Sequence, residues 1–228
     1  MKTLIDFDNA VVFAIPGSHQ GMLLEGPQGW GEFSPPPGVD DGQAVRWLTA
    51  AVEPGTVGWP DPVRGRIPVA VQIPGVSPQE AHQLASTSGC QTAEVTVGDS
   101  ADDLTRLAAV REALGPAGRI RCVVDAVWDV DTAVAAIGAL AAAAGELEYV
   151  EQPCVLLAEL AEVRRGVDVR IAADLGRVAA REWATVADCA DVAVLTGAAL
   201  GGVRRALRAA ESVGLPSVVR SRPETSVG

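Results

Sequence analysis

The stretch IRCVVDAVWDVDTAVAAIGALAAAAGELEYVEQP, residues 120–153, decides the fold class of this chain. It runs from a short β-branched segment through a turn into an alanine-rich segment with helical periodicity, and then into a second β-branched segment. Strands that alternate with helices in this way pair in parallel, because a parallel connection needs a crossover of a dozen or more residues. We therefore predict a β–α–β unit that carries Asp125 and Glu151 at its strand ends.

The same strand–turn–helix unit repeats from residue 63 onward. Short β-branched segments occur at residues 67–73, 92–97, 120–124, 147–150, 169–172, 192–195 and 217–219. Segments with helical periodicity lie at residues 78–86, 101–114, 129–144, 156–165, 179–186 and 201–213. Seven such strands in succession favour a TIM-type (β/α) barrel over an open sheet. No eighth unit follows, so we expect about seven strands, in a barrel that is either incomplete and closed by terminal or partner segments, or truncated.

The first 62 residues have a different pattern. Residues 10–15 and 21–25 are predicted as strands of an antiparallel meander, with GWGEF at residues 29–33 extending the second strand and a helix at residues 40–52. The segment at residues 53–66 is rich in Pro and Gly, which is typical of a domain boundary. We therefore predict a small α+β capping domain at residues 1–62 and a (β/α) barrel domain at residues 63–228.

The composition disfavours several classes of function. The net charge is −11 at pH 7, whereas binding to nucleic acid or to an anionic membrane needs a basic surface. No apolar run approaches the roughly 20 residues that span a bilayer, and the first residues lack the pattern of a signal peptide. We therefore expect a cytoplasmic protein whose partner is a small-molecule ligand, with a homo-oligomer as a further possibility.

Several motifs occur in an order that is found in one known family. They are GWGEFSP (29–35), WDVDTAV (128–134), YVEQPC (149–154), IAAD (171–174), LGGV (200–203) and ETSVG (224–228). In these motifs the chain resembles the enolase superfamily and, within it, the actinobacterial o-succinylbenzoate synthases of menaquinone biosynthesis. The resemblance implies a (β/α) barrel with a small cap. It also implies that a proton next to a carboxylate is removed and that the resulting charge is stabilised on a divalent metal ion.

The catalytic lysines of this family have no counterpart here. The family's Lys-x-Lys pair on the second barrel strand falls on Glu94 and Thr96, and the lysine of the sixth strand falls on Thr196. The sequence contains a single lysine, Lys2. Threonine has no usable pKa near neutrality, so this replacement removes a titratable base. We therefore expect no o-succinylbenzoate synthase activity by the family's two-lysine mechanism.

The metal ligands of the family are only partly retained. The first metal-binding aspartate falls on Val123, with Asp125 where the family has asparagine. Glu151 and Asp174 are kept, whereas the acidic residue that follows Asp174 in the family is Leu175. Two hard ligands alone hold Mg²⁺ weakly. We therefore predict no cofactor; Mg²⁺ is not expected, and Glu151, Asp174 and an inward-shifted Asp125 are the only candidates for a weak site.

Strand alternation and the resemblance together give the candidate site. Glu94 is expected to face the barrel mouth, because Val95 and Val97 occupy the opposite face. Arg220 stands where the family has small serines, at a strand end where TIM barrels recognise anions. The catalytic candidates are Glu94, Asp125, Glu151 and Asp174. The substrate-binding candidates are Arg220, Thr196, Thr96, Val123 and Leu175.

Different classes of function remain open on this sequence. The first is a repurposed, metal-independent lyase, isomerase or cyclase that acts on a small, largely apolar or carboxylated molecule. The second is a non-catalytic pseudoenzyme that binds a ligand or a partner protein. An engineered variant of a known scaffold is a third reading. An apolar mouth that holds an ordered ligand favours the first class, whereas a mouth filled by side chains favours the second.

Overall fold

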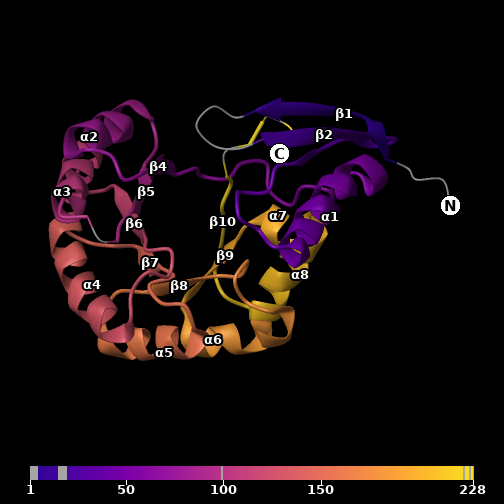
Figure 1. Cartoon of the computed structure of the whole chain (residues 1–228). Coiled ribbons are helices and arrows are strands. Elements are labelled where there is room, and N and C mark those ends of the chain that lie inside the picture. Colours follow the sequence, from indigo (N-terminus) through magenta and orange to yellow (C-terminus); the bar gives the residue numbers. More distant parts are fainter. Residues whose placement is uncertain (1–4, 15–19, 99, 223, 226, 228) are drawn as a thin grey trace. The chain divides into compact units, whose positions relative to one another are not determined.

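The computed structural model describes residues 5–14, 20–98, 100–222, 224–225 and 227 (Figure 1). The chain forms two compact units. The first unit comprises Met1–Val63, Leu175–Trp183 and Val194–Gly228, and the second comprises Arg64–Asp174 and Ala184–Ala193. Two residues of the ETSVG motif, Ser226 and Gly228, lie outside the described residues.

The first unit begins with a three-stranded antiparallel sheet. Its strands are β1 (Asp6–Ala14), β2 (Gln20–Gly26) and β3 (Gly29–Phe33), in the order β1-β2-β3. The prediction that the GWGEF motif extends the second strand is wrong. Gly26 pairs with Gly29, so the chain reverses at Pro27 and Gln28 and the motif returns as a separate strand. A two-residue reversal is the commonest hairpin connection.

Helix α1 (Asp41–Val57) packs against this sheet. At its start, the Asp40 carboxylate accepts a hydrogen bond from the Gln43 N–H at 2.8 Å, and the Gln43 side chain accepts one from the Asp40 N–H at 3.2 Å. This reciprocal pair is a capping box. A Cβ on Gly31 would lie 1.7 Å from the carbonyl oxygen of Ala51, so β3 can approach the backbone of α1 only with glycine there.

The first unit also contains the C-terminal elements α7 (Gly197–Leu200), α8 (Val203–Val213) and β10 (Ser217–Val219). Arg204 in α8 donates from Nη1 to Oε1 of Glu53 at 3.0 Å and to the carbonyl oxygen of Gly58 at 2.8 Å. A Cβ on Gly202, whose φ is 115°, would lie 2.0 Å from Oε2 of Glu53. These contacts join the start of α8 to the end of α1.

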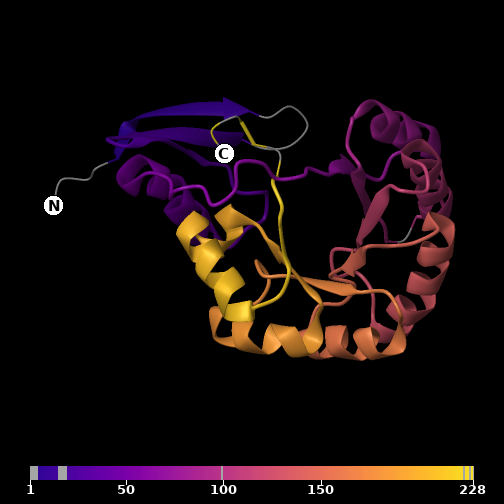
Figure 2. The same cartoon turned by 180° about the vertical axis from the view of Figure 1, so that it is seen from behind.

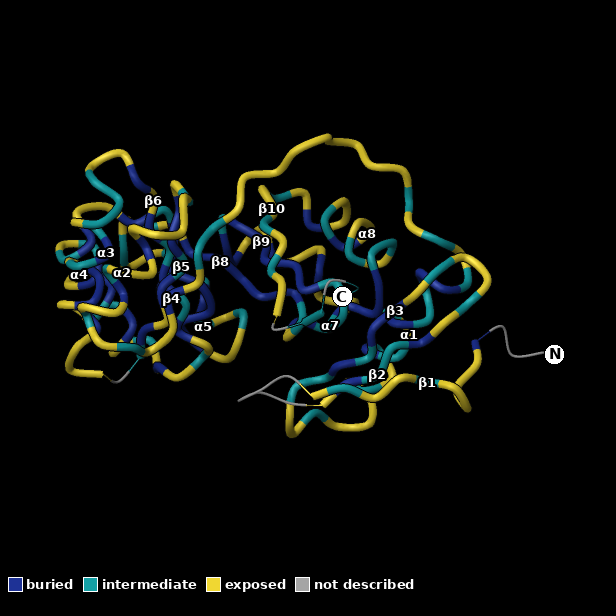
Figure 3. Tube along the Cα trace, turned by 90° about the horizontal axis from the view of Figure 1, so that it is seen from above, coloured by how far each residue is buried: buried dark blue, intermediate teal, exposed yellow. Residues whose placement is uncertain are grey.

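The second unit is built from parallel strands covered by helices. Its strands are β4 (Val71–Ile73), β5 (Thr92–Thr96), β6 (Arg119–Val123), β7 (Tyr149–Glu151) and β8 (Ile171–Asp174), and each pairs in parallel with the next. Helices α2 (Pro78–Thr87), α3 (Asp103–Leu114), α4 (Val130–Ala144) and α5 (Leu157–Gly166) lie outside these strands (Figure 2). β7 and β8 are buried along their whole length, and the trace at β8 is dark blue in Figure 3.

The barrel-type strands, with β9 (Val192–Leu195), follow the order β10-β9-β8-β7-β6-β5-β4. This order and the parallel pairing confirm the predicted fold class, a TIM-type α/β arrangement after an N-terminal α+β segment. The strand expected from residue 67 begins only at Val71, consistent with Pro68 having no N–H to donate. The helix expected at residues 179–186 is a 3-10 helix, η1 (Ala180–Thr185), followed by α6 (Val186–Cys189). Among the described helices, none is long and apolar enough to cross a membrane.

Candidate functional site

Three of the predicted site residues lie side by side at the ends of neighbouring strands of the second unit. In β5, Ala93 and Val95 are fully buried, so Glu94 and Thr96 belong to the opposite face. In the parallel register Thr96 stands beside Val123, which in turn stands beside Glu151. Thr96 is exposed, Val123 is half-buried and Glu151 is buried. These three strand ends therefore present their side chains on the same face.

Two residues earlier in each of these strands, a second set of neighbouring side chains lies on the same face. It contains a cation, Arg121, that sequence reasoning missed. Glu94 stands beside Arg121, and Arg121 stands beside Tyr149. The Arg121 Nε donates to Oε2 of Glu148 at 2.6 Å, and its guanidinium carbon lies 5.2 Å from the centre of the Tyr149 ring. Burial works against the charge, but the hydrogen bond to Glu148 and the nearby Tyr149 and Glu94 outweigh it and raise the pKa of Arg121. The sequence does carry a signal for this position: Arg121 alternates with the buried residues Ile120 and Cys122 in β6, so its side chain belongs to the opposite face.

The ends of the neighbouring strands β7 and β8 each carry a buried carboxylate. Glu151 is 1% exposed and Asp174 is 7% exposed. Glu151 pairs with Ala172, and Asp174 follows two residues later, so both belong to the same face of the sheet. The side chain of Gln152 joins the two strand ends: its Oε1 accepts from the Asp174 N–H at 2.9 Å, and its Nε2 donates to the Cys154 carbonyl at 2.9 Å. The glutamine of the YVEQPC motif therefore positions Asp174.

The segment after β6 adopts an unusual backbone conformation. Asp125 has φ 61° and Ala126 has φ 65°, in the left-handed region where residues other than glycine cost about 1–3 kcal/mol. The Ala126 N–H donates to the Gln152 carbonyl at 2.7 Å, and the Trp128 N–H donates to the Pro153 carbonyl at 3.1 Å. The segment is thereby held alongside the end of β7. Backbone strain of this kind clusters at functional sites. The strained residue Asp125 is exposed and follows the end of β6.

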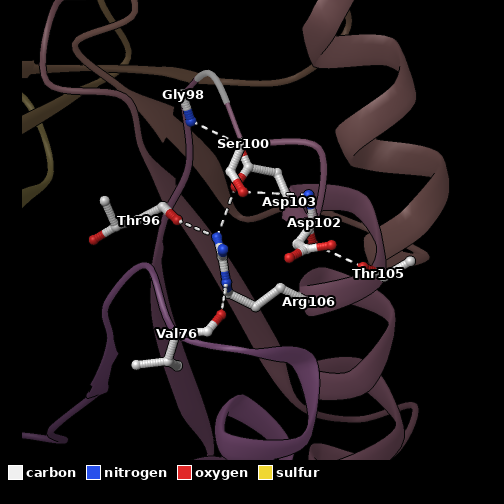
Figure 4. A network of polar contacts seen from close by, with 8 residues as sticks. All are labelled: Val76, Thr96, Gly98, Ser100, Asp102, Asp103, Thr105 and Arg106. Atoms are coloured by element: carbon white, nitrogen blue, oxygen red, sulfur yellow. Dashed lines mark hydrogen bonds and ion pairs between the residues drawn. The ribbon is translucent and has the colours of Figure 1, made fainter.

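A buried ion pair fixes the end of β5 (Figure 4). Arg106 of α3 is 2% exposed and donates from Nη1 to Oδ1 of Asp103 at 2.7 Å and to the Thr96 carbonyl at 3.1 Å. Its Nε donates to the Val76 carbonyl at 2.7 Å. The second carboxylate oxygen of Asp103 accepts from the Gly98 N–H at 2.7 Å. This network ties the strand that carries Glu94 and Thr96 to the loop after β4.

The remaining predicted residues belong to the first unit. Thr196 and Arg220 line a cavity of about 280 Å³ there. Arg220 follows β10, and its N–H donates to the Leu195 carbonyl at 2.9 Å. Leu175 is fully buried, and its N–H donates to the Val194 carbonyl at 2.9 Å. The structure therefore brings Thr196 and Arg220 to one cavity and places Leu175 in the interior.

The cysteines offer no reactive thiolate near these strand ends. All four are free thiols. Burial, as the largest cause, raises the pKa of Cys122 and of Cys154, which lie in and just after the strands that carry Val123 and Glu151. Neither thiol is therefore readily ionised near neutral pH.

The donor set at β7 and β8 suits Mg²⁺. Mg²⁺ is a hard ion that is usually held by one or two carboxylates together with waters and substrate oxygens, rather than by a full cage of protein ligands. Glu151 and Asp174 supply two buried carboxylates on neighbouring strands. Within the described residues, no group of three His, Cys, Asp or Glu side chains is arranged to hold a metal ion. The residues therefore fit an ion that shares its coordination with a ligand.

Comparison with known proteins gives the family. The model of the enolase C-terminal domain-like family matches residues 77–219, and that of the enolase N-terminal domain-like family matches residues 18–55. The chain belongs to the enolase superfamily. It is 51% identical to the o-succinylbenzoate synthase of Thermobifida fusca over 92% of this chain and 67% of that protein. It is 42% identical to the o-succinylbenzoate synthase of Mycolicibacterium smegmatis, over 90% and 65% of the two chains.

Solved structures support the fold. The substrate-liganded L-Ala-D/L-Glu epimerase of Bacillus subtilis superimposes with a TM-score of 0.78 at 21% identity, covering 98% of this chain and 83% of that one. This chain of the enolase superfamily spans about two thirds of the length of the o-succinylbenzoate synthases that it matches.

The matches correct one prediction. We predicted from the sequence that the protein uses no cofactor, and this prediction is wrong: the related o-succinylbenzoate synthases belong to a superfamily of Mg²⁺-dependent enzymes. The error came from treating the replacements at Val123 and Leu175 as the loss of the whole site. A hard ion that keeps waters and binds substrate oxygens does not need every protein ligand.

Proposed function

We propose that this chain is an o-succinylbenzoate synthase-like protein that binds a small carboxylated molecule together with Mg²⁺ at the ends of β5–β8. The observation that carries the proposal is the pair of buried carboxylates, Glu151 and Asp174, on adjacent strands joined by Gln152. These two residues would hold the ion, with Asp125 as a third candidate. When bound, Mg²⁺ supplies positive charge that favours a substrate carboxylate and the removal of a neighbouring proton.

Glu94 is the proposed proton-transfer residue. It occupies one of the positions where the family has lysine, and strand alternation puts it on the same face as Glu151. Its carboxylate oxygen takes the proton from the carbon next to the substrate carboxylate and returns it to a leaving group or to a neighbouring carbon. Thr96 contributes a hydroxyl to the same face but no base. The reaction class is therefore that of a lyase or an isomerase.

A second candidate function is binding of a carboxylated ligand without turnover. The observation that favours it is the replacement of the lysine positions by Glu94, Thr96 and Thr196 in a sequence whose single lysine is Lys2. Two of these replacements have no group that titrates near neutrality. Under this candidate the Mg²⁺ site and the ligand persist, and only proton transfer is lost.

A crystal structure of the protein soaked with MgCl₂ and o-succinylbenzoate tests the proposal. We expect density for the ion in contact with the carboxylates of Glu151 and Asp174, and density for a ligand carboxylate beside it. The matched control is the Asp174→Asn variant, in which one charged ligand becomes neutral and the ion density should weaken or vanish. Ligand density at the same strand ends with no ion in crystals of the unaltered protein would contradict the metal assignment.

A further inference from the structure

The segment between α1 and β4 is open to solvent along its whole length. Each residue from 61 to 69 is exposed, and every other run of exposed residues in the described part of the chain is shorter. Val63, Ile67 and Val69 are 96%, 68% and 70% exposed. Because so little of these side chains is covered, another protein can reach the segment over its full length.

The backbone of this segment belongs to no helix or strand. Residues 61–69 also make no backbone hydrogen bond with any other described residue. Pro62 and Pro68 have no N–H to donate, and each disfavours helical backbone in the residue before it. Proteases cut folded proteins in exposed segments of this kind, because the chain can enter the protease active site without prior unfolding.

Two arginines in this segment, Arg64 and Arg66, supply the side chain that one class of protease recognises. Trypsin-like proteases bind such a side chain in a pocket with an aspartate at its base and cut the peptide bond that follows it. Both arginines are exposed, and Gly65 between them has no side chain that could block a protease. The segment thus offers two neighbouring bonds to one protease specificity, Arg64–Gly65 and Arg66–Ile67.

Other exposed arginines are less accessible to a protease. Arg208 is exposed but lies within α8, so several residues around it must leave the helix before it can be cut. Arg177 is exposed outside a helix, but Leu175 and Val178 on either side of it are buried. Cleavage at such positions follows the small population of molecules that are locally open.

A cut in this segment leaves the two products in contact. The part before the cut contains β1, β2, β3 and α1, and the part after it supplies α7 and α8 to the same compact unit. Helix α1 packs against α7, and Arg204 of α8 donates to Glu53 of α1 at 3.0 Å. The Thr225 N–H donates to Glu32 of β3 at 2.9 Å. Separate contacts therefore hold the N-terminal fragment after the chain is cut.

We propose that residues 61–69 form a processing site for a protease of trypsin-like specificity. Water adds across the Arg64–Gly65 bond, which gives Arg64 a carboxylate and Gly65 an amino group, and the Arg66–Ile67 bond is cut in the same way. The product is a protein of two chains that keeps its fold. This site does not involve the carboxylates of β7 and β8, so its test is independent of the Mg²⁺ site.

Limited digestion of the full chain with trypsin tests the processing site. Intact-mass spectrometry at short times identifies the bond that is cut first. We expect the first products to end at Arg64 or Arg66, at an initial rate about tenfold or more above that of any other bond. The double variant Arg64→Gln/Arg66→Gln should lose this cut and slow the loss of intact chain about tenfold. Arg208→Gln, which removes an exposed arginine from α8, should leave the rate unchanged.

Gel filtration of the cut protein tests whether the fold survives. The two fragments should elute together in buffer at the volume of the intact chain, and they should separate only in guanidinium chloride. A first cut at another arginine, or an equally fast loss of intact chain in the double variant, would overturn the processing site. Separation of the fragments in buffer would overturn the two-chain product.

Discussion

Replacing Glu94 by glutamine is expected to slow Mg²⁺-dependent proton exchange by about 100-fold or more, the usual contribution of a positioned acid or base. Glutamine keeps the shape of the side chain but cannot accept a proton. The measurement follows o-succinylbenzoate with Mg²⁺ in D₂O by NMR, through the loss of signal from protons next to the succinyl carboxylate. The unaltered chain should exchange these protons faster than buffer does.

The control for this experiment is His82→Ala. His82 is half-buried on α2, and its removal should change the exchange rate by no more than about twofold, as for a substitution away from the site. If Glu94→Gln exchanges as fast as the unaltered chain, another group moves the proton. If the unaltered chain gives no exchange above buffer, binding without turnover becomes the better account.

Replacing Arg106 by methionine is expected to lower the free energy of unfolding by about 3–5 kcal/mol. The change leaves Asp103 as an unpaired charge in the interior, and it removes the donors to the Val76 and Thr96 carbonyls. Urea denaturation at pH 7 gives the free energy from the midpoint and slope. Methionine keeps most of the apolar stem, so the loss reports on the polar network.

The matched control is Arg181→Met. The Arg181 side chain is 84% exposed, and its Nη2 lies 3.7 Å from Oε2 of Glu182, so the two form an ion pair on the surface. Its loss should cost less than about 1 kcal/mol, because solvent screens exposed pairs. A cost below 1 kcal/mol for Arg106→Met as well would show that the buried network does not hold the end of β5.

The sequence predicts the strand order and the faces of the strands well, for a local physical reason. Apolar residues that alternate with polar ones fix which face a side chain occupies, and this places Glu94 opposite Val95 and Val97, whereas Thr96 and Val123 were assigned through the family resemblance. The parallel pairing follows from the helix between consecutive strands. Neither inference needs a long-range contact.

What the sequence does not predict depends on contacts between distant residues. The close approach of Gly31 to the backbone of α1 is such a contact, and no local pattern reveals it. The role of Gln152 depends on the neighbouring strand, whose Asp174 N–H it accepts. The cofactor prediction failed for another reason: the replacements at Val123 and Leu175 say little about an ion that completes its coordination with solvent and substrate.

The central claim is that Mg²⁺ and a carboxylated ligand share the site at Glu151 and Asp174. Calorimetric titration of Mg²⁺, with and without saturating o-succinylbenzoate, tests it most directly. We predict that the ligand tightens Mg²⁺ binding by about tenfold, because a ligand carboxylate in contact with the ion adds a favourable interaction to both binding steps. Glu151→Gln should abolish this coupling, whereas Asp131→Asn, an exposed carboxylate on α4, should preserve it. Mg²⁺ binding that is the same with and without the ligand, and unaffected by Glu151→Gln, would contradict the account.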